Sequence, residues 1–134
     1  MATVKLTADN FAQTVGENDT VLIDFWAPWC PPCLIFGPIF EKVSEKHPDI
    51  VFGKCNTEEQ QALASNFQIM SIPTLMVIRD RIVVFSRAGA LPQGALEELI
   101  SKVKELDMDD VRARVAEQEA ERGRKPGEGK GSVN

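Results

Sequence analysis

Two cysteines three residues apart, Cys30 and Cys33, follow an apolar segment and are separated by two prolines. The apolar run over residues 21–26 predicts a strand, and apolar residues recur at helical spacing after Cys33, so we expect the pair at a helix N-terminus. A helix N-terminus favours the thiolate, because its unpaired N–H groups and positive dipole end stabilise the anion. The pattern predicts dithiol–disulfide exchange, with Cys30 as the exposed attacking thiolate and Cys33, about one turn further in, as the resolving thiol.

The two intervening prolines, Pro31 and Pro32, suit the first turn of a helix. That turn does not need its own N–H groups, and proline fixes φ near the helical value. Pro32 disfavours helical geometry at the residue before it, so we expect the helix to start at about Pro32. Both rings stiffen the loop between the cysteines.

A single acid, Asp24, interrupts the otherwise apolar strand predicted over residues 20–26. Burying a carboxylate costs several kcal/mol unless the group is paired or protonated, so its presence requires a reason. One interpretation is a structural acid paired with Lys54, which would lower the pKa of Asp24 while burial raises it. We favour a second interpretation, in which Asp24 accepts the proton of Cys33 directly or through water.

The main structural alternative for the cysteine pair is half of a metal site. A tetrahedral zinc site needs four ligands, and the chain offers only Cys55 and His47 in addition, neither at a ligand-like spacing. We therefore expect no metal. Cys55 is interpreted as a small buried apolar residue. The alternative for an exposed Cys55 is glutathionylation or a disulfide between two chains.

Length and composition favour one globular domain. The chain has 134 residues, 43% of them hydrophobic, and no apolar run of membrane-spanning length. No signal peptide is recognisable at the N-terminus, so we expect a cytoplasmic monomer whose three cysteines serve redox chemistry. A net charge of -5 gives no basic surface for nucleic acid or an anionic membrane, so neither is an expected partner.

Hydrophobic periodicity predicts the element order β-α-β-α-β-α-β-β-α. Such an order indicates an α/β fold with a mixed central sheet, helices on both faces and a hairpin at residues 79–81. Residues 1–106 form the expected domain, 107–122 a charged extension compatible with a helix, and 123–134 a disordered tail. The strands are predicted at residues 4–6, 20–26, 50–55, 74–78 and 82–85, and the helices at 9–15, 32–47, 58–67 and 91–106.

The segment Trp29-Cys30-Pro31-Pro32-Cys33 resembles the active-site motif of the thioredoxin family, which more often has glycine in the place of Pro31. The resemblance covers residues 4–106 and implies a thioredoxin fold. Arg81 stands where the family usually has a hairpin glycine, so we expect a different turn type there. Further matching positions are Asp24-Phe25-Trp26, Pro38, Lys54, Ile72-Pro73-Thr74 and Gly89-Ala90, whereas Thr57 and Ser71 depart from the common pattern.

The resemblance also assigns roles. Cys30 is the nucleophile, Cys33 the resolving thiol and Asp24 the proton acceptor, while Lys54 tunes the acid. A cis bond before Pro73 would place it beside the cysteines and expose the Ile72 backbone to an extended substrate. The implied substrate-binding residues are Trp29, Pro31, Pro32, Ile72, Pro73, Gly89 and Ala90.

These roles imply a cytosolic reductase of protein disulfides. The implied partners are disulfide-containing proteins and a thioredoxin reductase that uses flavin and NADPH, with no cofactor bound to this chain. The proline pair leaves open a same-fold disulfide oxidase or isomerase with another reduction potential. A third interpretation is a binding module without enzymatic activity, in which the thiols act only as a switch. A zinc module is the weakest of these alternatives.

Overall fold

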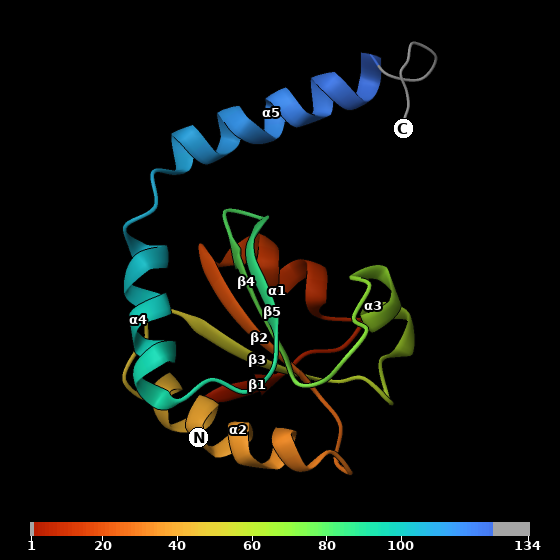
Figure 1. Ribbon diagram of the computed structural model, residues 1–134, viewed down its shortest axis with the longest axis vertical. Coiled ribbons are helices and arrows are strands. Elements are labelled where there is room, and N and C mark those ends of the chain that lie inside the picture. Colours follow the sequence, from red (N-terminus) through yellow and green to blue (C-terminus); the bar gives the residue numbers. More distant parts are fainter. Residues whose placement is uncertain (1, 125–134) are drawn as a thin grey trace. The chain divides into compact units, whose positions relative to one another are not determined.

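The structure is a computed structural model that describes residues 2–124 (Figure 1). The predicted order of strands and helices is confirmed, and one further helix follows. The strands are β1 (Thr3–Lys5), β2 (Thr20–Trp26), β3 (Val51–Asn56), β4 (Thr74–Arg79) and β5 (Ile82–Ala88), and the helices are α1 (Phe11–Glu17), α2 (Pro31–Ser44), α3 (Gln61–Asn66), α4 (Gln93–Lys104) and α5 (Met108–Arg124).

The five strands form one mixed sheet in the order β1-β3-β2-β4-β5. The central strand β2 runs parallel to β3 and antiparallel to β4. It is buried from Thr20 to Phe25, as expected for a strand covered on both faces. The α/β class with a mixed sheet is thereby confirmed.

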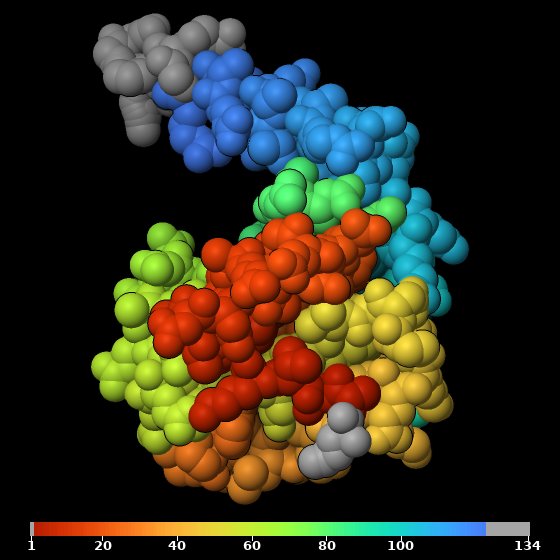
Figure 2. All heavy atoms as spheres, turned by 180° about the vertical axis from the view of Figure 1, so that it is seen from behind, coloured from red at the N-terminus to blue at the C-terminus, as the bar shows by residue number. Residues whose placement is uncertain are grey.

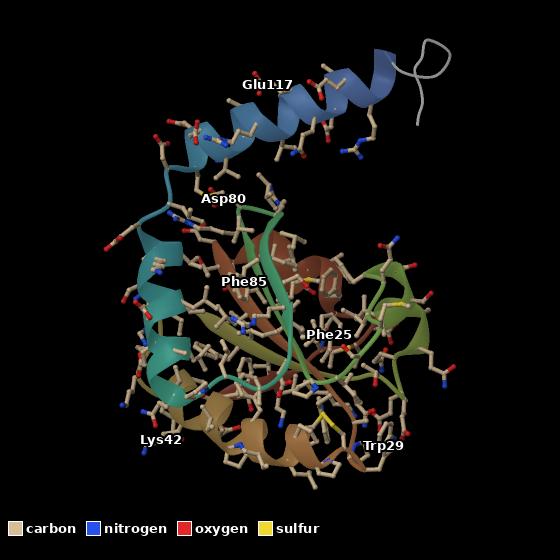
Figure 3. All side chains as sticks on the ribbon, viewed as in Figure 1. Phe25, Trp29, Lys42, Asp80, Phe85 and Glu117 are labelled. Atoms are coloured by element: carbon tan, nitrogen blue, oxygen red, sulfur yellow. A yellow bond between two sulfur atoms is a disulfide. The ribbon has the colours of Figure 1, made fainter. Side chains whose placement is uncertain are left out.

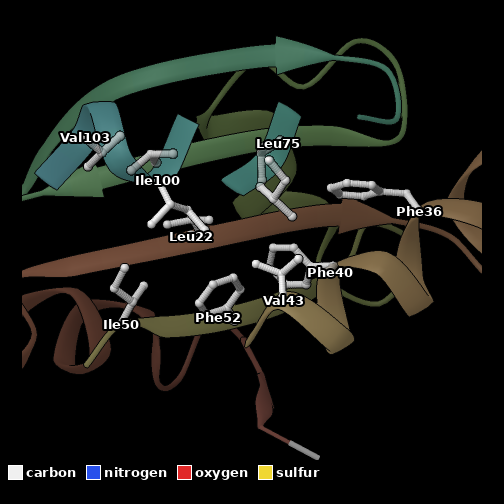
Figure 4. Close-up of a cluster of buried hydrophobic side chains, with 11 residues drawn as sticks. Leu22, Phe36, Phe40, Val43, Ile50, Phe52, Leu75, Ile100 and Val103 are labelled. Atoms are coloured by element: carbon white, nitrogen blue, oxygen red, sulfur yellow. The ribbon is translucent and has the colours of Figure 1, made fainter. Parts of the chain in front are cut away.

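Two apolar clusters fill the space between the sheet and its helices. One joins β2, β3 and β4 to α2 and α4, and Figure 4 shows Phe40, Phe52 and Leu75 within it. The other joins the opposite face to α1 and α3, and in Figure 2 the red α1 lies beside the yellow-green α3 on that side. Helices therefore cover both faces, as predicted.

Helix α2 starts at Pro31, one residue earlier than expected, with Cys30 as its N-cap. The extended backbone of Cys30 leaves Pro31 free to take the first helical position. The helix ends at Ser44, short of the predicted end at His47, because turns lead into Pro48. Because α2 begins soon after β2 ends, the cysteine pair lies at the carboxyl end of β2.

Two other local features differ from those predicted from the sequence. Helix α3 is shorter than the predicted 58–67, since turns occupy residues 57–59. In the hairpin, Asp80 and Arg81 have φ of 52° and 67°, so both adopt the left-handed conformation of a type I′ turn. The expectation that Arg81 would disfavour this turn was wrong. The Arg81 Nη2 donates a hydrogen bond to the Gly16 carbonyl at 3.0 Å, which ties the turn to α1.

The chain divides into two compact units, with the boundary between Val103 and Lys104. In the second unit, Asp107 Oδ1 accepts hydrogen bonds from the N–H groups of Asp109 and Asp110 and so caps α5. The tail predicted to be disordered, residues 123–134, overlaps the last two residues of α5. Its residues 125–134 lie outside the described part of the chain. Within residues 2–124, no helix is long and apolar enough to cross a membrane.

Candidate active site

Cys30 and Cys33 form a disulfide at the start of α2, near Trp29 (Figure 3). The Cys30 Sγ accepts a hydrogen bond from the Cys33 N–H at 3.2 Å, so the sulfur is itself the N-cap of the helix. Donation to sulfur at this position favours its anion once the disulfide is reduced. This geometry matches the predicted placement of the pair at a helix N-terminus, and the thiolate at Cys30 stays a prediction.

The expectation of an exposed Cys30 was wrong for this oxidised state, because both cysteines are only 2% exposed. The Cys30 Sγ turns inward to bond Cys33 and lies 3.8 Å from the Ile72 carbonyl oxygen. Ala27 is buried with the pair, and Trp26 and Ile72 pack against it. Trp29, which directly precedes the pair, is by contrast 64% exposed.

Asp24 is completely buried in β2, and neither of its carboxylate oxygens has a hydrogen-bond partner among residues 2–124. It is in register with Lys54 on β3 and Leu75 on β4, so its side chain faces the same side of the sheet as α2. Burial raises the pKa of Asp24 to about 7, although the positive charge of Lys54 lowers it in part. An acid whose pKa lies near neutrality, and whose oxygens lack a hydrogen-bond partner in the described part of the chain, is suited to proton transfer.

Lys54 lies beside this acid and also contacts an aromatic ring. Its Nζ sits 4.7 Å from the centre of the Trp26 ring, a cation–π distance. A side chain added at Gly37 would place its Cβ 3.3 Å from Nζ, so this glycine on α2 gives the lysine room. Lys54 therefore acts on Asp24 through its charge and is held in place by Trp26.

A surface pocket of about 310 Å³ extends from Cys33 to Lys54. It lies between α2 and the adjoining strands, on the side of the sheet that Asp24 faces. Such a pocket gives solvent access toward Cys33 and Lys54, whereas Asp24 is fully buried and does not line it. Its lining is Trp26, Cys33, Leu34, Gly37, Pro38, Glu41 and Lys54.

The loop before β4 supplies another wall of the site. The Ile72–Pro73 peptide bond is cis, and the Pro73 carbonyl accepts a hydrogen bond from the Gly89 N–H at 2.8 Å. Gly89 has φ of 105°, a conformation that glycine adopts at low cost. Pro73 is buried, whereas Gly89 and the following Ala90 are exposed. The structure thus brings Ile72, Pro73 and Gly89 to the Cys30 side of the disulfide.

One residue of the site was missed in the sequence. The Trp29 Nε1–H donates a hydrogen bond to the Glu58 carboxylate, which anchors the exposed indole. Glu58 follows the end of β3, and Trp29 follows the end of β2. Because these strands are parallel neighbours, the residues that follow them meet at the same end of the sheet. The predicted parallel strands were therefore the signal in the sequence from which this contact could have been found.

The remaining thiol and the imidazole lie outside the site. Cys55 is fully buried, which confirms its interpretation as a small core residue, and burial together with the charge of Asp24 raises its pKa to about 11. His47 Nε2 lies 2.7 Å from a Glu97 carboxylate oxygen. Among residues 2–124, no group of three or more His, Cys, Asp or Glu side chains is placed to hold a metal ion.

Comparisons with known proteins agree with this geometry. The family model "Thioredoxin" matches residues 2–102. The chain is 56% identical over 122 residues to "Putative thioredoxin 2" of Streptomyces coelicolor, with 91% of each chain covered. It is 41% identical over 103 residues to "Thioredoxin" of Bacillus subtilis, covering 76% of this chain and 98% of that one.

Solved structures show the same architecture. A mutant thioredoxin from Halobacterium salinarum superposes with a TM-score of 0.71 at 33% identity, covering 78% of this chain and 91% of that one. Mitochondrial thioredoxin 3 from Saccharomyces cerevisiae, in its oxidised form, gives a TM-score of 0.69 at 32% identity, covering 75% and 94%. The mixed five-stranded sheet with helices on both faces is common to this fold.

Proposed function

The chain belongs to the thioredoxin family and is a protein-disulfide reductase whose redox group is the Cys30–Cys33 disulfide, and we propose that Cys30 attacks, Cys33 resolves and Asp24 takes the proton. The hydrogen bond from the Cys33 N–H to Cys30 Sγ carries this assignment, because it singles out Cys30 as the sulfur stabilised as an anion. The activity serves cell redox homeostasis.

The proposed reaction balances in two displacements. The Cys30 thiolate attacks one sulfur of the substrate disulfide, forming a mixed disulfide and releasing the other substrate sulfur as a thiolate. Cys33 then loses its proton to Asp24 and attacks the Cys30 sulfur. The Cys30–Cys33 disulfide forms, the second substrate thiolate leaves, and two electrons have passed from the protein to the substrate.

The environment of Asp24 supports its role. A pKa of about 7 leaves the acid partly ionised at neutral pH, so it can accept a proton and later release it. Lys54 lowers this pKa against the effect of burial, which keeps the acid from remaining permanently protonated. The pocket lined by Cys33 and Lys54 brings solvent close to the thiol that would give up the proton.

The proposed substrate surface surrounds Cys30. An extended substrate segment would pair with the Ile72 backbone as an added strand and contact the Trp29 ring. Pro73 is buried, so in this proposal it acts by fixing the Ile72 backbone rather than by touching substrate. Exposed residues complete the surface, namely Pro31, Pro32, Gly89 and Ala90.

Thioredoxin-family proteins have reductase and substrate partners in general. For this chain we infer, more specifically, regeneration by a flavin- and NADPH-dependent thioredoxin reductase, no bound cofactor, and action as a monomer without nucleic acid or membrane. The proposal places the reaction in the cytosol, where thiols are kept reduced and electrons flow toward disulfides.

Two cysteine variants test the assignment. Cys30→Ser is expected to abolish reduction of a disulfide-containing protein, whereas Cys33→Ser traps a mixed disulfide that non-reducing electrophoresis detects. Trapping through Cys33 in Cys30→Ser would reverse the two roles.

The reduction potential tests the direction of the reaction. In buffered dithiol mixtures, a value well below that of the glutathione pool supports a reductase. A value well above it would favour the disulfide oxidase or isomerase that the proline pair leaves open.

A further inference from the structure

The outward side of α2 is apolar from Pro31 to Pro38. No charged side chain occurs from Phe25 to Phe40. Leu34 is 57% exposed and Ile35 66% exposed, although both are large aliphatic residues. We call this surface the α2 apolar face, and it consists of the exposed residues Pro31, Pro32, Leu34, Ile35 and Pro38.

Packing within the domain does not require these side chains. The inner side of α2 already fills the core through Phe36, Phe40 and Val43. A helix on the surface of a globular domain normally presents polar residues to solvent, and α2 does so only near its end, with the exposed Lys42. Exposed apolar surface of this kind usually marks an interaction site.

The α2 apolar face is continuous with the redox centre. Leu34 lies one turn after Cys30, and its N–H donates to the Cys30 carbonyl at 3.1 Å. Ile35 is five residues beyond Cys30, or roughly 7.5 Å along the helix axis. In an extended substrate, the side chain two residues from the reacting cysteine is about 6.6 Å from it, a length of the same order as the first turns of α2.

We propose that the α2 apolar face binds apolar side chains that flank the reactive cysteine of an extended substrate segment, so that the protein prefers disulfides in apolar surroundings. This inference rests on the proposed attack by Cys30, because that attack brings the substrate segment to the start of α2. Leu34 and Ile35 contribute binding that depends on the residues beside the substrate disulfide, and they take no part in the chemistry.

The test uses the full chain and two synthetic peptides. Each peptide carries one internal disulfide, with either leucine or serine two residues from the cysteines. Reduced protein is mixed with each peptide, and the second-order rate of peptide reduction is measured in a single turnover, so that no reductase takes part. The variant is Leu34→Ser with Ile35→Ser, and the matched control is Val83→Ser, an exposed apolar residue on β5.

We expect wild type to reduce the leucine peptide about tenfold faster than the serine peptide, a factor equivalent to one good apolar contact. The double variant should lose this preference with an unchanged rate on the serine peptide, and Val83→Ser should behave as wild type. Equal rates of wild type on both peptides would overturn the inference while leaving the proposed function intact. Failure to reduce either peptide would overturn the proposed function itself.

A second copy of the chain is the competing occupant of this face. Sedimentation at rising concentration distinguishes it, because a monomer throughout supports a substrate-binding face. Self-association that disappears in Leu34→Ser with Ile35→Ser would assign the face to a dimer and refute the substrate preference.

Discussion

Replacing Asp24 with asparagine should stabilise the fold in a way that depends on pH. The side chain is fully buried with no hydrogen-bond partner in the part of the chain that the structure describes, and its pKa rises from an ordinary 3.8 to about 7, chiefly through burial. Below pH 3.8, both the folded and the unfolded protein hold the proton, so the acid has no pH-dependent cost. Between pH 3.8 and about 7, only the unfolded chain releases it, and the wild type loses stability as pH rises.

The size of this effect follows from the two pKa values. A difference of about three pH units, at 1.36 kcal/mol per unit, amounts to roughly 4 kcal/mol above pH 7. Asparagine has a similar shape and does not ionise in this range. The stability advantage of Asp24→Asn should therefore grow by roughly 4 kcal/mol between pH 4 and pH 8.

Urea unfolding of the oxidised protein, followed by tryptophan fluorescence at several pH values, measures this difference. Asp9→Asn is the control, since that aspartate is exposed and its replacement should change stability by less than about 0.5 kcal/mol. An advantage of Asp24→Asn that stays constant from pH 4 to pH 8 would refute the reasoning, because it would mean that Asp24 ionises equally in both states. The same variant should reduce disulfides more slowly and accumulate the mixed disulfide.

Three further predictions concern packing, reactivity and an ion pair. Gly53→Ala should destabilise the protein by about 1–3 kcal/mol in urea unfolding, because the added Cβ would lie 2.4 Å from a Leu6 methyl carbon. The Cys55 thiol, which is fully buried with a pKa near 11, should resist a thiol reagent until the protein unfolds, and rapid labelling of the native protein would contradict its burial. The hydrogen bond from His47 lowers the pKa of Glu97, so Glu97→Gln should reduce the free energy of unfolding by up to about 1 kcal/mol at pH 7. Below that lowered pKa the wild-type carboxyl is protonated too, and the variant should then be as stable as wild type. A loss of stability that persists at low pH would exclude this origin.

Local sequence patterns were sufficient for most of the architecture. Periodicity predicted the order of strands and helices, and the bounds of β2 were correct to the residue. The errors occurred where local rules compete with tertiary contacts. Arg81 adopts positive φ in the hairpin, where its side chain bonds the Gly16 carbonyl, a contact 65 residues away in the chain. Local turn propensity does not include contacts between residues so far apart in the sequence.

The chemistry of the cysteine pair follows from the sequence, because spacing and helix position already place one sulfur over the N–H groups of the first turn. The surroundings of the pair were decided by tertiary structure. The parallel neighbours β2 and β3 bring Glu58 to Trp29, and the inward turn of the disulfide buries Cys30.

Exposure is the property that the linear pattern could not supply. Leu34 and Ile35 stand in a stretch without charges, and the recurrence of apolar residues there predicts a helix but does not tell which of its sides is buried. The sheet covers only one side of α2, and so these two side chains remain in solvent beside the redox centre. Sequence determines which side chains a helix carries, whereas burial depends on what packs against each of its faces, and only the folded chain decides that.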